Sequence, residues 1–167
     1  LFLAFSGLVL MMVIFIFLYF PARFYDQALS GVRDQAQSFA EFLAFSMSPA
    51  IDFDDPVSGQ ESMTAAEQNE QVAFVVVHGK QDAEFASFAK SIALNAAYAG
   101  AGTGRLSEDG NLWMTSAPVM HQERKMGTVF VGFSLDKMKA EVRRSQKLIA
   151  LISLLLLVVG VGLVFWV

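Results

Sequence analysis

The residues best suited to proton transfer or metal binding are two histidines, His78 and His121, which lie in HGKQD and HQERKM. Both segments are predicted hairpin turns, where a histidine is usually solvated. A metal site would need carboxylates such as Asp82 or Glu123 to converge on one of them, and a nucleophilic site would need a hydroxyl or thiol beside a base. Neither histidine has a partner at a diagnostic spacing, and the chain has no cysteine. We predict no catalytic residue, no metal site and no enzyme activity within these residues.

Two further motifs only partly match known binding loops. GAGTGR, at Gly100–Arg105, has the glycines of a phosphate-binding loop but not the Lys-Ser/Thr that opens a helix after them. The carboxylates Asp52, Asp54 and Asp55 lack the central Gly and the distal Glu of a calcium loop. We therefore expect a flexible loop and a solvated turn, and no cofactor.

Charge is segregated along the chain. All 28 charged residues lie between Arg23 and Lys147, so that 1–20 and 148–167 carry none. Twenty apolar residues form a helix of about 30 Å, which matches the hydrocarbon core of a bilayer. We predict two transmembrane helices at 1–20 and 148–167, a domain at 21–134 and a juxtamembrane helix at 135–147.

The charge balance also bears on partners. The net charge is −4, and the main basic cluster, Lys137–Lys147, directly precedes the second predicted span. Phospholipid headgroups account for such a cluster better than a nucleic acid does. We expect the lipid bilayer as a partner and no nucleic acid.

Residues 22–47 predict a long helix that ends at Ser48-Pro49, because the residue before a proline avoids the helical region. Apolar and small residues recur along it at alternating spacings of four and three. These residues are Tyr25, Leu29, Val32, Ala36, Phe39, Leu43 and Ser46. These residues are either the inner face of one amphipathic helix or part of the seam of a two-helix homodimer. The seam would consist of Tyr25, Leu29, Val32, Phe39 and Leu43.

Two β-hairpins are expected in the loop domain. The first joins 72–78 to 83–88 and the second joins 112–120 to 127–134, because both contain β-branched and aromatic runs around polar turns. Short helices are expected near 58–70, from two capping-box patterns, and over 89–99.

Ser134 is a predicted N-cap for a last helix. The apolar residues Leu135, Met138 and Val142 are spaced at three and four along that helix, which enters the second span without a breaker. A displacement of the last strand is therefore expected to pass into the span.

This order of elements resembles the extracytoplasmic PAS-like sensor domains, of single Cache type, of bacterial transmembrane receptors. The resemblance rests on Val72–Phe88 (VAFVVVHGKQDAEFASF), Leu112–Met120 (LWMTSAPVM) and Lys125–Val142 (KMGTVFVGFSLDKMKAEV). It implies an α+β fold in which two transmembrane helices flank a PAS-like antiparallel sheet with a long N-terminal helix. It also implies a two-pass protein of the bacterial inner membrane with a periplasmic loop, and an output domain beyond Val167 whose class stays open.

A ligand pocket in such a domain would lie on the concave face of the sheet. The candidate ligand-binding residues are Phe74, Val76, Tyr98, Arg105, Trp113 and Thr115. Tyr98 and Arg105 would orient an acidic ligand, whereas the apolar members could instead simply fill the core against the long helix.

Two functions follow from these observations. In the first, the loop domain binds a small ligand or a partner protein and shifts the last helix by about 1–2 Å, as switches at packed interfaces do. In the second, the chain is an accessory subunit of a larger membrane complex and its loop domain is a docking surface.

Overall fold

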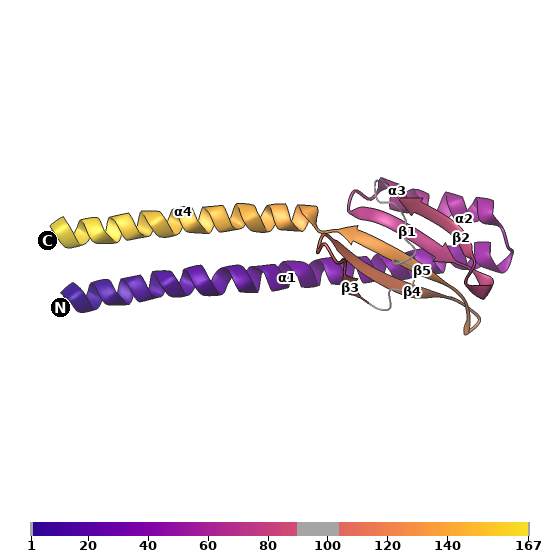
Figure 1. Cartoon of the computed structure of the whole chain (residues 1–167), viewed down its shortest axis with the longest axis horizontal. Coiled ribbons are helices and arrows are strands. Elements are labelled where there is room, and N and C mark those ends of the chain that lie inside the picture. Colours follow the sequence, from indigo (N-terminus) through magenta and orange to yellow (C-terminus); the bar gives the residue numbers. More distant parts are fainter. Residues whose placement is uncertain (1, 90–103, 167) are drawn as a thin grey trace. The chain divides into compact units, whose positions relative to one another are not determined.

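A computed structural model of the chain describes residues 2–89 and 104–166, so the helix predicted over 89–99 and most of the glycine-rich loop lie outside the described residues. The elements in chain order are α1 (Phe2–Asp52), α2 (Pro56–Ser62), α3 (Thr64–Gln68), β1 (Val72–His78), the short 3-10 helix η1 (Lys80–Asp82), β2 (Glu84–Ala89), β3 (Arg105–Leu106), β4 (Leu112–His121), β5 (Arg124–Ser134) and α4 (Asp136–Trp166) (Figure 1).

The chain divides into two compact units. One comprises Leu1–Ser30 with Met138–Val167, and the other comprises Gly31–Lys137. The second unit contains the sheet, the last part of α1 and the helices α2 and α3, and it holds every feature described below unless stated otherwise.

The sheet has five antiparallel strands in the order β2-β1-β5-β4-β3. Both predicted hairpins are present, as β1–β2 and β4–β5, and they join through the pairing of β1 with β5. The predicted α+β class, with a long N-terminal helix and a C-terminal helix, is confirmed. The two-residue strand β3 lies in the segment predicted to be a loop. That segment has no β-branched run from which a strand could be predicted.

The predicted end of the first helix is wrong, because α1 passes through Pro49 and ends at Asp52. Proline removes one backbone hydrogen bond from a helix and is tolerated best in the first turn, so Pro49 near the end of α1 needs compensation. That turn is held by Ile51, which is 1% exposed, and by a bond from the Phe53 amide to the Pro49 carbonyl. The Ser48 hydroxyl also donates to the Met120 carbonyl of β4. Tertiary packing thus outweighs the local preference.

The acidic turn after α1 is a helix cap. Asp55 accepts hydrogen bonds from the amides of Val57 and Ser58 and from the Ser58 hydroxyl, and Pro56 occupies the first turn of α2. The short helix therefore begins before the predicted Ser58. The side-chain bond from Ser58, followed by its backbone bond, lowers the pKa of the Asp55 carboxyl.

The centre of the sheet is closed by a contact between an aromatic ring and a glycine. Gly132 of β5 pairs with Phe74 of β1 on one side and with Met114 of β4 on the other. A Cβ at position 132 would lie 2.1 Å from Cε1 of Phe74, whose side chain is fully buried. The close approach predicted at Gly132 is confirmed.

The two terminal helices run from the sheet unit to the ends of the described chain. Within the described residues, none of the helices combines the length and the apolar character that crossing a bilayer requires. The spans predicted at 1–20 and 148–167 are thus not shown by the structure.

We predict that Gly132→Ala lowers the free energy of unfolding by about 1–3 kcal/mol, because the added methyl overpacks the core against Phe74. The matched control is Gly31→Ala, where a Cβ meets no atom within 4 Å on the exposed side of α1. That change should raise stability by about 0.5–1 kcal/mol, because glycine is unfavourable inside a helix. Urea unfolding of both variants measures the difference, and equal effects would contradict the packing account.

A second prediction concerns pH. Because the pKa of Asp55 is lower in the folded state than its ordinary value of 3.8, its contribution to stability is complete above that value and is lost as the pH falls through the lower folded value. Asp55→Ala should destabilise the chain at pH 7 and less so in strong acid. Asp55→Asn, which can cap without charge, should show a smaller dependence on pH. Urea unfolding at both pH values tests this, and an acid-independent gap for Asp55→Ala would contradict it.

Candidate functional site

The structure divides the predicted ligand pocket between the two faces of the sheet. Phe74 of β1 is in register with Met114 of β4 across Gly132, so both side chains lie on one face. Trp113 and Thr115 flank Met114 in sequence and therefore lie on the opposite face. Among the described residues, Phe74 and Val76 thus lie on the face opposite to Trp113 and Thr115.

The face that carries Phe74 and Val76 is a packed apolar cluster. Its members are Ala73, Phe74, Val76, Leu112 and Met114, with Phe130 against them. The His78 ring packs edge-on against Phe130 at a centroid distance of 5.3 Å. His78 is thus half-buried at the end of β1, contrary to the solvated turn predicted for it.

The face that carries Trp113 and Thr115 packs against α1. The Arg33 guanidinium lies 4.4 Å from the centre of the Trp113 ring, a cation–π contact. Thr115 Oγ1 donates to Gln37 Oε1 at 2.6 Å, and the Thr115 side chain is buried. These two residues attach β4 to the long helix, which agrees with the core-filling alternative rather than with an open binding surface.

The last two predicted pocket residues lie elsewhere. Arg105 is exposed on β3, where it is in register with Met114. Tyr98 lies outside the described residues. The pocket that Tyr98 and Arg105 would close therefore stays a prediction.

The predicted dimer seam lies largely inside the single chain. Leu29, Val32 and Leu43 are buried, and Tyr25 and Phe39 are half-buried. The Phe39 ring contacts the buried Phe133 ring at a centroid distance of 5.7 Å. In the single chain the heptad pattern marks the inner face of an amphipathic helix, and a seam with a second copy stays a prediction.

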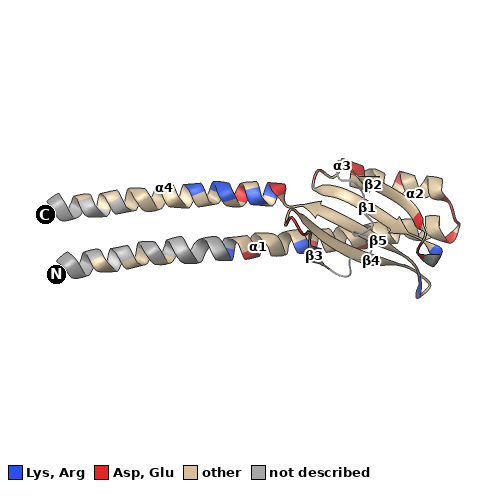
Figure 2. Ribbon diagram, viewed as in Figure 1, with Lys and Arg blue, Asp and Glu red and all other residues tan. Residues whose placement is uncertain are grey.

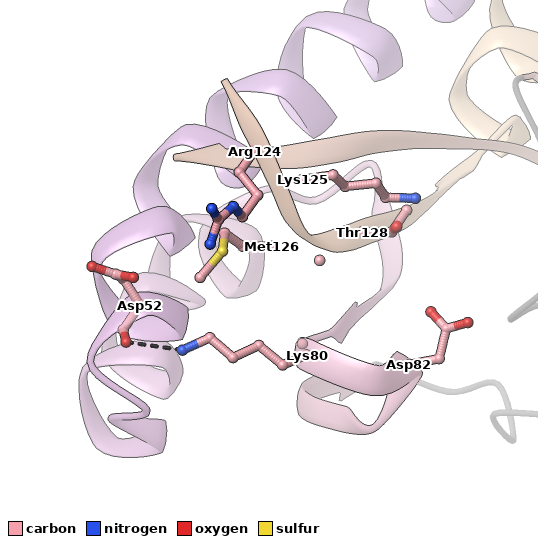
Figure 3. A pocket seen from close by; sticks show the side chains of 9 residues that line it. Asp52, Lys80, Asp82, Arg124, Lys125, Met126 and Thr128 are labelled. Atoms are coloured by element: carbon pink, nitrogen blue, oxygen red, sulfur yellow. Dashed lines mark hydrogen bonds between the residues drawn. The ribbon is translucent and has the colours of Figure 1, made fainter. Parts of the chain in front are cut away.

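A cleft of about 680 Å³ lies at the end of the sheet where the β4–β5 hairpin turns (Figure 3). It is lined by Asp52 at the end of α1, by Gly79, Lys80 and Asp82 after β1, and by residues 124–128 of β5. The Lys80 ammonium donates to the Asp52 carbonyl at 3.1 Å, which joins two walls of the cleft. The volume lies within the range of small-molecule sites.

A smaller hollow of about 330 Å³ adjoins the same hairpin and shares Asp52, Arg124 and Met126 with the cleft. His121 Nε2 lies there, 3.8 Å from Asp52 Oδ2. Among residues 2–89 and 104–166, no group of three or more histidines and carboxylates is placed to hold a metal ion.

Four large apolar side chains are exposed on α1, in the turn after it and on α2. Phe45 is 82% and Phe53 is 81% exposed, and Phe42 and Val57 are also largely exposed. We call these three phenylalanines and Val57 the aromatic face. Large exposed apolar patches commonly mark sites of association. The heptad pattern does not include these residues, so it did not predict the aromatic face. Phenylalanines off the buried pattern of a helix are themselves a sign of an exposed apolar surface.

The junction of β5 with α4 is firmly held. The Ser134 amide donates to the Gln71 carbonyl at 2.7 Å, and the Leu135 amide donates to the Asn111 carbonyl at 2.9 Å. Leu135 is fully buried. The Ser134 hydroxyl accepts from the Asp136 amide, as predicted for an N-cap. The residues between β5 and the first residues of α4 are therefore hydrogen-bonded to the sheet unit.

Residues 30–132 match CHASE8, a periplasmic sensor domain. The chain belongs to the CHASE8 family. The match extends from within α1 nearly to the end of β5, and so covers both hairpins and the cleft. No curated protein matches the chain.

The predicted resemblance is therefore confirmed at the level of a periplasmic sensor domain that provides sensory input to a receptor. The CHASE8 domain begins near Gly31, where the second compact unit also begins, so the two boundaries agree. The family match contains β1, β2, β4 and nearly all of β5, together with the part of α1 from residue 30 to Asp52.

We predict that Thr115→Val lowers the free energy of unfolding of the CHASE8 domain by about 1 kcal/mol, because it leaves Gln37 without its buried donor. Ser30→Ala is the matched control, since the Ser30 hydroxyl is exposed and bonds only within its own helix. That change should stay within about 0.5 kcal/mol of the parent. Equal losses in urea unfolding would contradict a specific attachment of β4 to α1.

Proposed function

We propose that the chain is the sensory input region of a bacterial membrane receptor, and that it transmits a shift of the last strand across the membrane through α4. The observation that carries this proposal is the continuity of β5 with α4 through the buried Leu135. Met138 and Val142 continue the buried side of α4 at spacings of three and four. The bonds from the Ser134 amide to Gln71 and from the Leu135 amide to Asn111 would couple a shift of β5 to the start of α4.

The proposed membrane anchors are 1–20 and 148–167. Support comes from the absence of charge in both segments and from the exposure of apolar side chains along α4. Eight of them are 51–64% exposed: Leu148, Leu151, Ile152, Leu154, Leu155, Leu156, Val158 and Val159. The basic residues of α4 lie near its beginning, just before this apolar stretch (Figure 2). That order suits a helix that leaves the headgroup region and enters lipid.

A second candidate function is docking without signalling, as an accessory subunit of a larger complex. The aromatic face favours it, because Phe45 and Phe53 are exposed on the domain surface. We propose that this face, in place of the predicted seam, is where a second copy of the chain or a periplasmic protein binds. In a receptor such binding would itself be an input, so the two candidates differ in whether α4 responds.

The proposal predicts that output depends on the rotational phase of α4. Residues 1–167 would be fused ahead of a cytoplasmic histidine kinase domain, with one to four alanines inserted between Lys147 and Leu148. Each insertion rotates the following helix by about 100°. Kinase activity in isolated membranes should change markedly with one or two insertions and return toward the parent value near four.

The control replaces Gln146 and Lys147 by alanine, which changes side chains without changing the phase. This variant should keep the parent activity. An output that is insensitive to all four insertions would contradict transmission through α4 and would leave docking as the better account.

A further inference from the structure

The cleft at the hairpin end of the sheet concentrates positive charge on an acidic domain. Residues 31–137 contain 14 acidic and seven basic side chains. The seven basic residues are Arg33, Lys80, Lys90, Arg105, Arg124, Lys125 and Lys137. Three of them, Lys80, Arg124 and Lys125, line this one cleft. An even spread of charge would not bring nearly half of the cations of the domain to one hollow.

These cations are not neutralised by the carboxylates beside them. In the described part of the chain, neither Asp52 nor Asp82 forms an ion pair with Lys80, Arg124 or Lys125. Asp52 instead lies against His121, and the Lys80 ammonium donates to the Asp52 main-chain carbonyl. In Figure 3 the Asp82 carboxylate lies on the side of Lys125 and Thr128, away from Arg124. Arg124 and Lys80 therefore lie where an anion can approach them without displacing an ion pair with Asp52 or Asp82.

The polar groups of the cleft lie on two sides of it. Figure 3 shows the Arg124 guanidinium and the Lys80 ammonium on the side of Asp52. The Lys125 ammonium and the Thr128 hydroxyl lie near each other on the other side. A guanidinium binds a carboxylate through two parallel hydrogen bonds, and an ammonium with a hydroxyl can hold a second acidic group.

Strained backbone surrounds the same end of the domain. In the described residues, positive φ at non-glycine positions occurs at Asp54 (53°), Asp82 (58°), Gln122 (46°) and Glu123 (65°). These residues lie in the three turns that follow α1, β1 and β4, next to the residues that line the cleft. At Gln122 and Glu123 positive φ is the ordinary geometry of a two-residue hairpin turn, so the backbone strain typical of functional sites is confined to Asp54 and Asp82 among these four.

We propose that this cleft binds a small organic anion with two separated acidic groups, one at Arg124 and Lys80 and the other at Lys125 and Thr128. The inference rests on the proposed sensory function and names the ligand class of its input. Arg124, Lys125 and Thr128 all belong to β5, the strand that continues into α4. A ligand that binds these residues would therefore act on β5, the strand that continues into α4.

The test is calorimetric titration of the purified full chain, in detergent, with glutarate. The neutral diamide glutaramide and the monoanion butyrate serve as matched probes of similar size, and inorganic phosphate serves as a single-centre dianion. We expect saturable binding of glutarate that weakens with added salt. Butyrate and phosphate should bind more weakly, and glutaramide should not bind.

Variants locate the site. Arg124→Gln and Lys125→Gln should each weaken glutarate binding by about ten- to a hundred-fold, the usual effect of losing a charged hydrogen-bond partner. Arg124→Lys should recover part of the loss. Arg144→Gln, an exposed arginine of α4 outside the cleft, should bind as the parent does. Far-UV circular dichroism checks that each variant is folded.

Three results would overturn the proposal: no saturable glutarate binding at millimolar concentration, equal affinity in Arg124→Gln and the parent, or a loss confined to Arg105→Gln, which would place the ligand at the other predicted pocket. Phosphate or butyrate binding as tightly as glutarate would overturn the two-group geometry. None of these results alters the insertion series in α4, so failure of the ligand assignment is distinguishable from failure of the sensory function.

Discussion

The domain depends on the burial of Phe133. Its side chain is fully buried, it pairs in register with Trp113 of β4 and Val72 of β1, and its ring packs edge-on against Phe39 of α1. Burying a phenylalanine stabilises a fold by about 1.5–3 kcal/mol, and edge-to-face packing adds to this. The ring contact that joins α1 to the sheet therefore lies three residues before α4 begins.

The two faces of the sheet have separate tasks. One face holds α1 through Trp113 and Thr115, and the other is a tightly packed cluster around Phe74 in which Gly132 is required for the ring to fit. A cleft lies at the hairpin end, where the strands leave the core and charged side chains can reach solvent. In the proposed function, a ligand binds at this end of β5 and α4 responds at the other end.

Sequence patterns predicted the parts of the fold that depend on local composition. The β-branched run of β1 and the alternation in β5 predicted both hairpins. Ser134 predicted where α4 begins. The heptad pattern found the buried face of α1 but could not say what covers it, because the same pattern suits a second helix or a sheet. The pocket prediction placed Trp113 and Phe74 on the same face of the sheet. Which face each residue occupies depends on the pairing register of the strands, and that register is irregular between Val72 and Phe74. The cleft could not be predicted, since Asp52 reaches it only because α1 continues past Pro49.

We propose that the end of β5 and the beginning of α4 open as one cooperative unit. Native-state hydrogen exchange of the full chain tests this most directly, because residues of one cooperative unit open with the same free energy. The account predicts that the amides of Val131, Phe133, Leu135 and Val142 share one opening free energy, and that it falls together for all four in Gly132→Ala. Separate opening of α4, with Val142 unaffected by Gly132→Ala, would contradict it.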